Sequence, residues 1–131
     1  MIERTDNFVV VQRDIDRNKH MGNYRYNYHF NVFREMFFDG NGFSVDSLAM
    51  RELGLYIPSK DTKYVRPTFK GDSLSVKTRF RRYEGNDRIV IVQKMFRGDD
   101  IISREHSIYV LVGLEDGKSK EIPVDLVERI I

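Results

Sequence analysis

Ten residues near the N-terminus, DIDRNKHMGN at positions 14–23, bring together the side-chain types used in acid–base and acyl-transfer chemistry. A carboxylate can attack a carbonyl or activate water, and an amide and an imidazole can orient the reacting groups. Asp16, Asn18 and His20 alternate along the chain, so an extended backbone places all three on one side. The spacing predicts a candidate catalytic set suited to acyl transfer.

The same residues also have a simpler interpretation, as the start of a helix. Asp16 or Asn18 can cap a helix by accepting hydrogen bonds from its unpaired first-turn amides, and His20 then has no chemical role. In the functional interpretation, the amides near Gly22 and Asn23 carry partial positive charge and bind a developing oxyanion. Both interpretations require a helix that begins beside this stretch.

The segment that follows has the spacing of an amphipathic helix. Four aromatic residues recur at i, i+4, i+7 and i+11, which draws one apolar stripe: Tyr26, Phe30, Phe33 and Phe37. Four further apolar residues widen it: Met21, Val32, Met36 and Phe38. We expect a helix over about residues 21–38, covered by other structure on several sides and ended by Gly40 and Gly42.

The remaining elements indicate a sheet around that helix. A β-branched run predicts a first strand at residues 8–11, and two-residue alternation or flanking turns predict three more at 74–81, 88–96 and 101–112. Short helices are expected at about 47–53, closed by Gly54, and after Pro123. This order predicts an α+β fold in which one curled antiparallel sheet wraps a long central helix.

Composition narrows the classes of function. The 131 residues suit one domain over 1–131, with 40% hydrophobic and 32% charged residues. A net charge of +2 argues against nucleic acid as the main partner, and the absence of cysteine excludes thiolate chemistry. We see no metal-ligand spacing, so no metal or other cofactor is expected. No apolar run has the length of a membrane span, and the polar N-terminus predicts a cytoplasmic protein.

Two segments resemble a known family. The string DRNKHMGNYRY at residues 16–26 resembles the "DxNxHVNNxxY" signature of hotdog-fold thioesterases, in particular the acyl-acyl-carrier-protein and 4-hydroxybenzoyl-CoA thioesterase groups. The string YVRPTFKGD at residues 64–72 resembles the "YxRPxxxGD" segment of the same family. The similarity spans about residues 8–112 with the segments in the expected order, and it favours the functional interpretation over simple capping.

The resemblance implies a hydrolase that acts on an acyl-CoA or acyl-carrier-protein thioester. Asp16 then serves as nucleophile or as general base for water, and Asn18 and His20 match the family's polar pair. The oxyanion and substrate contacts carry over to Met21, Gly22, Asn23 and Tyr26. The resemblance also implies a hotdog fold of five or six strands and a homodimer or homotetramer with active sites at the subunit interface.

Some features of the sequence leave alternatives open. Gly22 stands where the family often has asparagine, and residues 64–72 contain Asp72 but no glutamate, so a fourth catalytic group is not identified. Glu35, on the expected helix, is held in reserve. A non-catalytic hotdog module that binds acyl thioesters remains the alternative function, although retention of the polar set favours an enzyme. A hotdog dehydratase is disfavoured because its glycine- and proline-flanked histidine is absent.

A basic segment follows the second motif. Its residues Arg79, Arg81 and Arg82 are interpreted first as a solvated face of a strand. They are also candidate contacts for the phosphates of coenzyme A or the acidic surface of a carrier protein.

Overall fold

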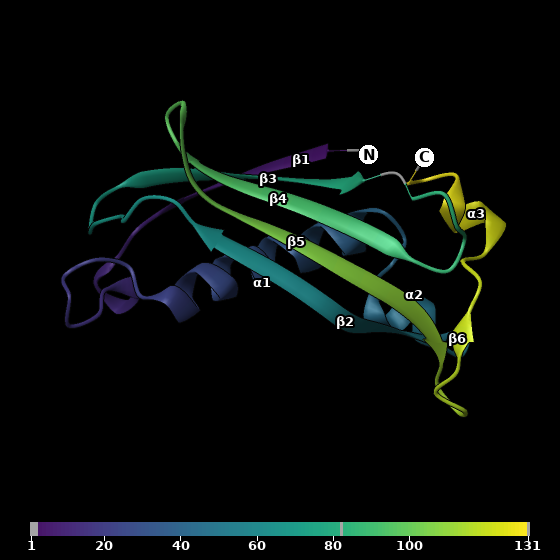
Figure 1. Ribbon diagram of the computed structural model, residues 1–131. Coiled ribbons are helices and arrows are strands. Elements are labelled where there is room, and N and C mark those ends of the chain that lie inside the picture. Colours follow the sequence, from purple (N-terminus) through teal and green to yellow (C-terminus); the bar gives the residue numbers. More distant parts are fainter. Residues whose placement is uncertain (1–2, 82, 131) are drawn as a thin grey trace.

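A curled antiparallel sheet and one long helix, α1 (Asn23–Gly40), form the framework of the molecule in the computed structural model, which describes residues 3–81 and 83–130 (Figure 1). The strands are β1 (Glu3–Val9), β2 (Leu53–Tyr64), β3 (Ser73–Arg81), β4 (Ile89–Arg97), β5 (Asp100–Gly113) and β6 (Ser119–Lys120). Three short helices complete the chain: η1 (Gln12–Asp14), α2 (Val45–Ala49) and α3 (Val124–Val127). The predicted α+β hotdog architecture is confirmed.

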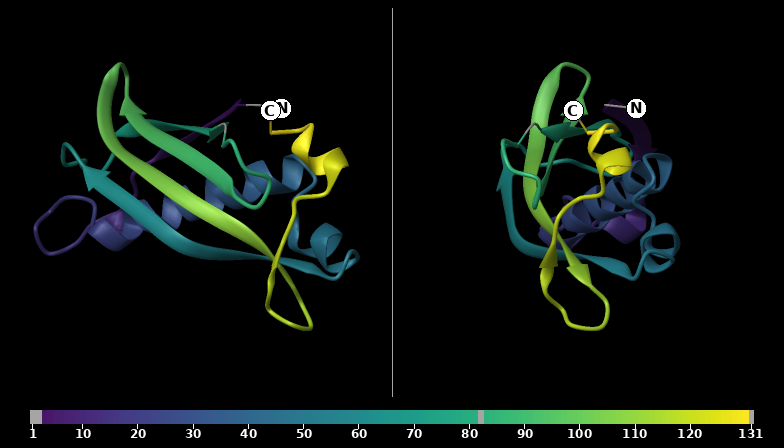
Figure 2. Two further views of the ribbon diagram at one scale, coloured as in Figure 1. Left: turned by 45° about the vertical axis from the view of Figure 1, so that its right-hand side comes forward. Right: turned by 90° about the vertical axis from the view of Figure 1, so that its right-hand side faces the viewer.

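The strand order within the described residues is β1-β3-β4-β5-β2, with β6 paired to β5. Every pairing is antiparallel, and β1 and β2 form the two long edges. Figure 2 shows how the curled sheet wraps around one side of α1. None of the helices in the described residues is long and apolar enough to cross a membrane.

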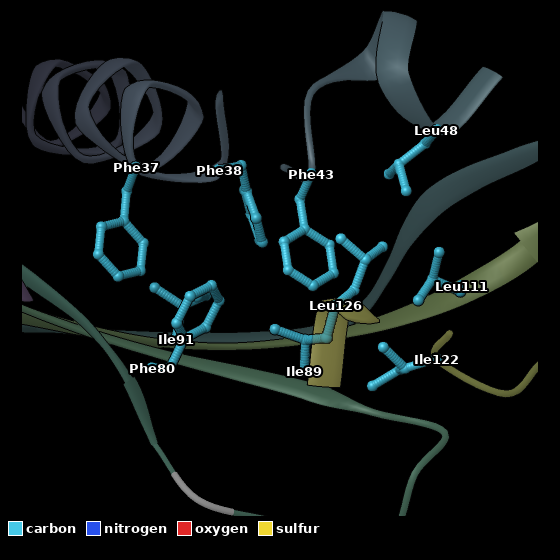
Figure 3. Close-up of a cluster of buried hydrophobic side chains, with 10 residues drawn as sticks. All are labelled: Phe37, Phe38, Phe43, Leu48, Phe80, Ile89, Ile91, Leu111, Ile122 and Leu126. Atoms are coloured by element: carbon cyan, nitrogen blue, oxygen red, sulfur yellow. The ribbon is translucent and has the colours of Figure 1, made fainter. Parts of the chain in front are cut away.

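The aromatic stripe of α1 packs into the concave side of the sheet. Tyr26, Phe30, Phe33 and Phe37 are at most 9% exposed, as the spacing predicted. Strand β3 alternates buried and exposed residues, and its Phe80 ring lies 4.7 Å from that of Phe37 between centroids. Figure 3 shows these rings with neighbouring apolar residues from β4, β5 and α3. Burial of this cluster attaches the helix to the sheet.

The cover over α1 is narrower than the sequence predicted. Met36 is 38% exposed and Val32 is half-buried, so the sheet covers one face of the helix and leaves the opposite face open. The helix also begins two residues later than predicted. Met21 instead forms an isolated β-bridge with Ile15, and Gly22 is the residue that precedes the helix.

The segment after α1 corrects two predictions. The short helix spans Val45–Ala49, not 47–53, because Ser44 caps it by accepting a hydrogen bond from the Ser47 amide. The chain reverses at Glu52, whose φ is 59°, while Gly54 lies inside β2. Sequence reasoning assigned no strand at β2, since a register shift between Tyr56 and Ser59 interrupts its alternation and most of its residues are exposed.

A buried polar network joins α1 to the sheet. Arg34 is 2% exposed and donates from Nη1 to Gln93 Oε1 at 3.0 Å and to Glu105 Oε2 at 3.2 Å. Its Nε donates to the Tyr109 hydroxyl. Glu105 also contacts Lys60 Nζ at 3.3 Å. Buried charges require such partners, so this network fixes how the helix sits on the sheet.

Candidate active site

The loop that carries the candidate catalytic residues closes on itself just before α1. The Asp16 amide donates to the His20 carbonyl at 3.1 Å, and the Asn18 amide donates to Asp16 Oδ1 at 2.8 Å. Lys19 takes a φ of 67° to make this turn. Asp16 and Asn18 are exposed and His20 is half-buried. The three residues predicted from the sequence therefore belong to one tight loop.

The Asp16 carboxylate lies beside the N-terminus of α1. A Cβ atom at position 22 would lie 3.5 Å from Asp16 Oδ2, an ordinary van der Waals contact, so the Asp16 carboxylate packs close to Gly22, the residue that precedes the helix. The Gly22 amide donates to the Asp14 carbonyl at 3.0 Å, and the Met21 amide donates to the Thr68 carbonyl at 2.8 Å.

The next two amides, of Asn23 and Tyr24, have no acceptor within the described residues. Both amides belong to the first turn of α1, where N–H groups point away from the helix and favour negative charge. The amides of Met21 and Gly22, two residues predicted from the sequence to be among the oxyanion and substrate contacts, are by contrast already paired within the chain.

The second motif packs directly against the first. The Tyr26 hydroxyl lies 3.1 Å from Thr68 Oγ1, and the Tyr64 hydroxyl donates to the Asn23 carbonyl at 3.5 Å. His20, Met21, Asn23 and Tyr26 line a groove of 220 Å³ together with residues 64–67. In Figure 1 the loop before α1 and the connection from β2 to β3 meet at the same end of the molecule. The fold thus brings both motifs together, and Tyr26, which is 3% exposed, holds them in contact.

Asp14 anchors this arrangement, and sequence reasoning gave it no role. Its side chain is 1% exposed, and Oδ1 accepts a hydrogen bond from Arg25 Nε at 2.8 Å and contacts His29 Nε2 at 3.0 Å. Oδ2 accepts from the Val11 amide at 3.0 Å. Burial opposes ionisation of Asp14, but these hydrogen bonds outweigh it and hold its pKa below the usual value. One carboxylate therefore ties the loop that carries the candidate catalytic residues to the first two turns of α1.

The sequence of this chain matches the thioesterase-like superfamily over residues 10–130. The match includes the loop with the candidate catalytic residues, the second motif and every strand from β2 to β6. The chain belongs to the thioesterase-like superfamily. A search of curated protein sequences finds no match.

Solved structures share the fold of this superfamily member. The hypothetical protein SAV2348 from Staphylococcus aureus, solved in complex with CoA, has a TM-score of 0.89 at 21% identity, covering 99% of this chain and 84% of that one. Slr0204, a 1,4-dihydroxy-2-naphthoyl-CoA thioesterase from Synechocystis, has a TM-score of 0.85 at 14% identity, covering 98% and 95%. A probable thioesterase from Bartonella henselae has a TM-score of 0.80 at 24% identity, covering 92% and 99%.

The other candidate residues of this thioesterase-like chain lie away from the loop. Glu35 is exposed and lines a separate cavity of 610 Å³ between α1, α2 and β2. Asp72 forms an ion pair with Arg97 at 2.9 Å and has the role of a turn residue. Arg79 and Arg81 point outward from β3, and Arg82 lies outside the described residues. No group of three or more potential metal ligands occurs in the part of the chain that the structure describes.

His29 gives the site a testable pH dependence. Burial lowers the pKa of His29 below its ordinary value of 6.5, because it outweighs the favourable contact with Asp14. The unfolded chain therefore binds a proton at His29 more readily than the folded chain, and stability falls as the pH drops below about 6.5. We expect a lower urea midpoint at about pH 5.5 than at about pH 7.5.

The matched variant for this measurement is His29→Gln, whose amide can donate to Asp14 without titrating. Its urea midpoint should fall less over the same interval. Asp14 affects stability in a separate, more acidic pH range. Because its pKa is lowered in the folded protein, its ionised form stabilises the fold above about pH 3.8, and this contribution is lost at lower pH. An equal loss in wild type and His29→Gln would contradict the assignment to His29.

Proposed function

We propose that the protein hydrolyses acyl-CoA thioesters, with Asp16 as the reacting carboxylate. One observation carries this proposal: the exposed Asp16 carboxylate lies beside Gly22 at the start of α1, where the amides of Asn23 and Tyr24 have no acceptor in the described residues. A carboxylate beside two free amides can act on a carbonyl whose oxygen those amides hold. Membership of the thioesterase-like superfamily supports the same chemistry.

The reaction has two possible routes at this geometry. As general base, Asp16 takes a proton from water as the water attacks the thioester carbonyl, and that proton then passes to the departing thiolate. As nucleophile, Asp16 attacks the carbonyl itself, expels the thiolate and forms an anhydride that water cleaves. In both routes the amides of Asn23 and Tyr24 stabilise the negative carbonyl oxygen.

Acyl-CoA is the favoured substrate class. Structures similar to this chain include a protein in complex with CoA and a 1,4-dihydroxy-2-naphthoyl-CoA thioesterase, which supports this choice over a carrier-bound thioester. A thiol-release assay on a panel of acyl-CoA and acyl-carrier-protein thioesters tests the function. We expect thiol release from acyl-CoA. If no thioester in the panel releases its thiol, the alternative function, a non-catalytic module that binds acyl thioesters, is favoured.

We also propose that the working form is a two-fold dimer joined along β2. This strand pairs only with β5 within the described residues, so its outer edge has backbone groups available to another strand. The groove lined by His20, Asn23 and Tyr64 holds only 220 Å³ in one chain, which is small for an acyl group with its pantetheine arm.

Light scattering measures this assembly directly. At micromolar concentration we expect a mass about twice the 15.5 kDa of one chain, or about four times if dimers pair. A stable monomer under the same conditions would contradict the dimer and remove the basis for an interface active site.

A further inference from the structure

Four basic residues form one continuous row across the outer face of the sheet. In the strand register, Lys77 lies opposite Lys94, Lys94 opposite Arg104, and Arg104 opposite Lys63. All four side chains are exposed. The row crosses β3, β4, β5 and β2, a distance of about 14 Å at the usual strand spacing. Figure 1 views this face, and α1 lies behind the sheet.

This arrangement opposes folding. Like charges directly opposite on neighbouring strands repel each other, and Lys94 has a cation on both sides. None of the four forms an ion pair with a carboxylate in the described residues. The acidic residues of this face, Glu3 and Asp61, lie at the two ends of the neighbouring row. The chain as a whole is nearly balanced, with a net charge of only +2, so a row of four neighbouring cations is a local feature of this face.

The surface is also hollowed at this row. Lys63, Lys94 and Arg104 of the row line a groove of 330 Å³ together with Arg79 and Arg81 of β3, whereas Lys77 lies outside it. Two acidic residues, Asp61 and the buried Glu105, also belong to the lining, so basic residues outnumber acidic ones there. The Arg81 guanidinium additionally lies 3.2 Å from His106 Nε2 on β5. A groove of this size suits a small ligand, whereas an acidic protein surface requires no concavity and a nucleic acid requires a longer track.

The row begins beside the candidate active site. Lys63 directly precedes Tyr64, whose hydroxyl lies 3.5 Å from the Asn23 carbonyl at the start of α1. Side chains of consecutive strand residues point to opposite faces, so Lys63 faces the row while Tyr64 faces the site. A ligand that spans the end of β2 reaches both.

We propose that this row, Lys63, Arg104, Lys94 and Lys77, binds the 3′-phosphoadenosine diphosphate end of coenzyme A. The proposal rests on the proposed function, because the thioester at the other end of the same molecule then lies near Asp16. The pantetheine arm passes around the end of β2, and the phosphate groups lie along the row. Charge-assisted hydrogen bonds to phosphate supply the binding energy and offset the repulsion among the cations.

Calorimetric titration with coenzyme A, 3′-phosphoadenosine 5′-phosphate and pantetheine tests the proposal without any turnover. In Lys94→Glu and Arg104→Glu we expect affinity for both phosphorylated probes to fall about tenfold or more, while affinity for pantetheine is unchanged. Lys94→Glu should also raise the thermal midpoint, because it relieves repulsion from Lys77 and Arg104. Lys118→Glu, at an exposed turn remote from the row, is the matched control and should alter neither binding nor repulsion within the row.

Several outcomes would overturn the proposal. One is that coenzyme A does not bind to the wild type, and another is that it binds equally to the wild type and both variants. A third is that Lys94→Glu and Arg104→Glu slow the hydrolysis of carrier-bound thioesters but not of acyl-CoA. That result would mean that the row binds an acidic carrier protein instead of coenzyme A. Binding of coenzyme A through the row without hydrolysis of any thioester would instead keep this inference and reject the proposed function.

Discussion

Asp16→Asn should reduce thioester hydrolysis by about a hundredfold or more, the scale expected for loss of a base or nucleophile, while the protein stays folded. Asparagine keeps the shape of the side chain, and its carbonyl oxygen can still accept the hydrogen bond that Asp16 Oδ1 receives from the Asn18 amide. The variant therefore separates chemistry from loop structure. Initial rates of thiol release and a urea titration measure the two.

Two further variants sharpen this experiment. Asp99→Asn makes the same change at an exposed position between β4 and β5 and should have wild-type rates. His20→Ala should lose less activity than Asp16→Asn if His20 only orients substrate or water. Equal rates in wild type and folded Asp16→Asn would remove Asp16 from the mechanism. Glu35, which lines the cavity of 610 Å³, would then be the next candidate for the reacting carboxylate.

Arg34→Met should have the largest effect on stability, about 3 kcal/mol in the free energy of unfolding. The substitution removes the guanidinium contact to Glu105 and leaves that buried carboxylate dependent on Lys60 and Thr62. Gln93 and Tyr109 lose a hydrogen-bond partner in the same step. Urea unfolding followed by circular dichroism measures the change.

The double variant Arg34→Met, Glu105→Gln identifies the cause. Removing the buried charge as well should restore part of the lost stability, so the two effects are not additive. Arg51→Met, which breaks the exposed pair with Asp125, is the control and should change stability little. A loss no larger in Arg34→Met than in Arg51→Met would show that the buried network contributes nothing particular.

The parts of the fold that sequence reasoning predicted have local signals. The stripe from Tyr26 to Phe37 and the alternation in β3 arise from residues a few positions apart, so periodicity was sufficient to find them. The candidate catalytic residues Asp16, Asn18 and His20 likewise lie within one short segment, so their spacing was visible in the sequence. β2 has no such signal, since most of its residues are exposed and a register shift breaks its pattern.

The unpredicted features depend on contacts between distant residues. Asp14 meets His29 only after the loop folds back on α1, so each appeared incidental in the sequence. Arg34 and Glu105 are separated by 71 positions, and charged residues on a helix or strand usually face solvent. The four basic residues of the row come from four different strands and are far apart in the sequence. Only the pairing of those strands brings them side by side.

The strand order also determines how the molecule assembles during synthesis. β3, β4 and β5 are consecutive hairpins, whereas β1 must find β3 and β2 must find β5 across much longer separations. The ribosome therefore releases α1 and the loop with the candidate catalytic residues well before the strands that support them. Until β3 and β4 emerge, the aromatic face of α1 lacks the strands that cover it. The candidate active site is thus synthesised early, but β2, which leads into its second motif, can pair only after β5 has been made.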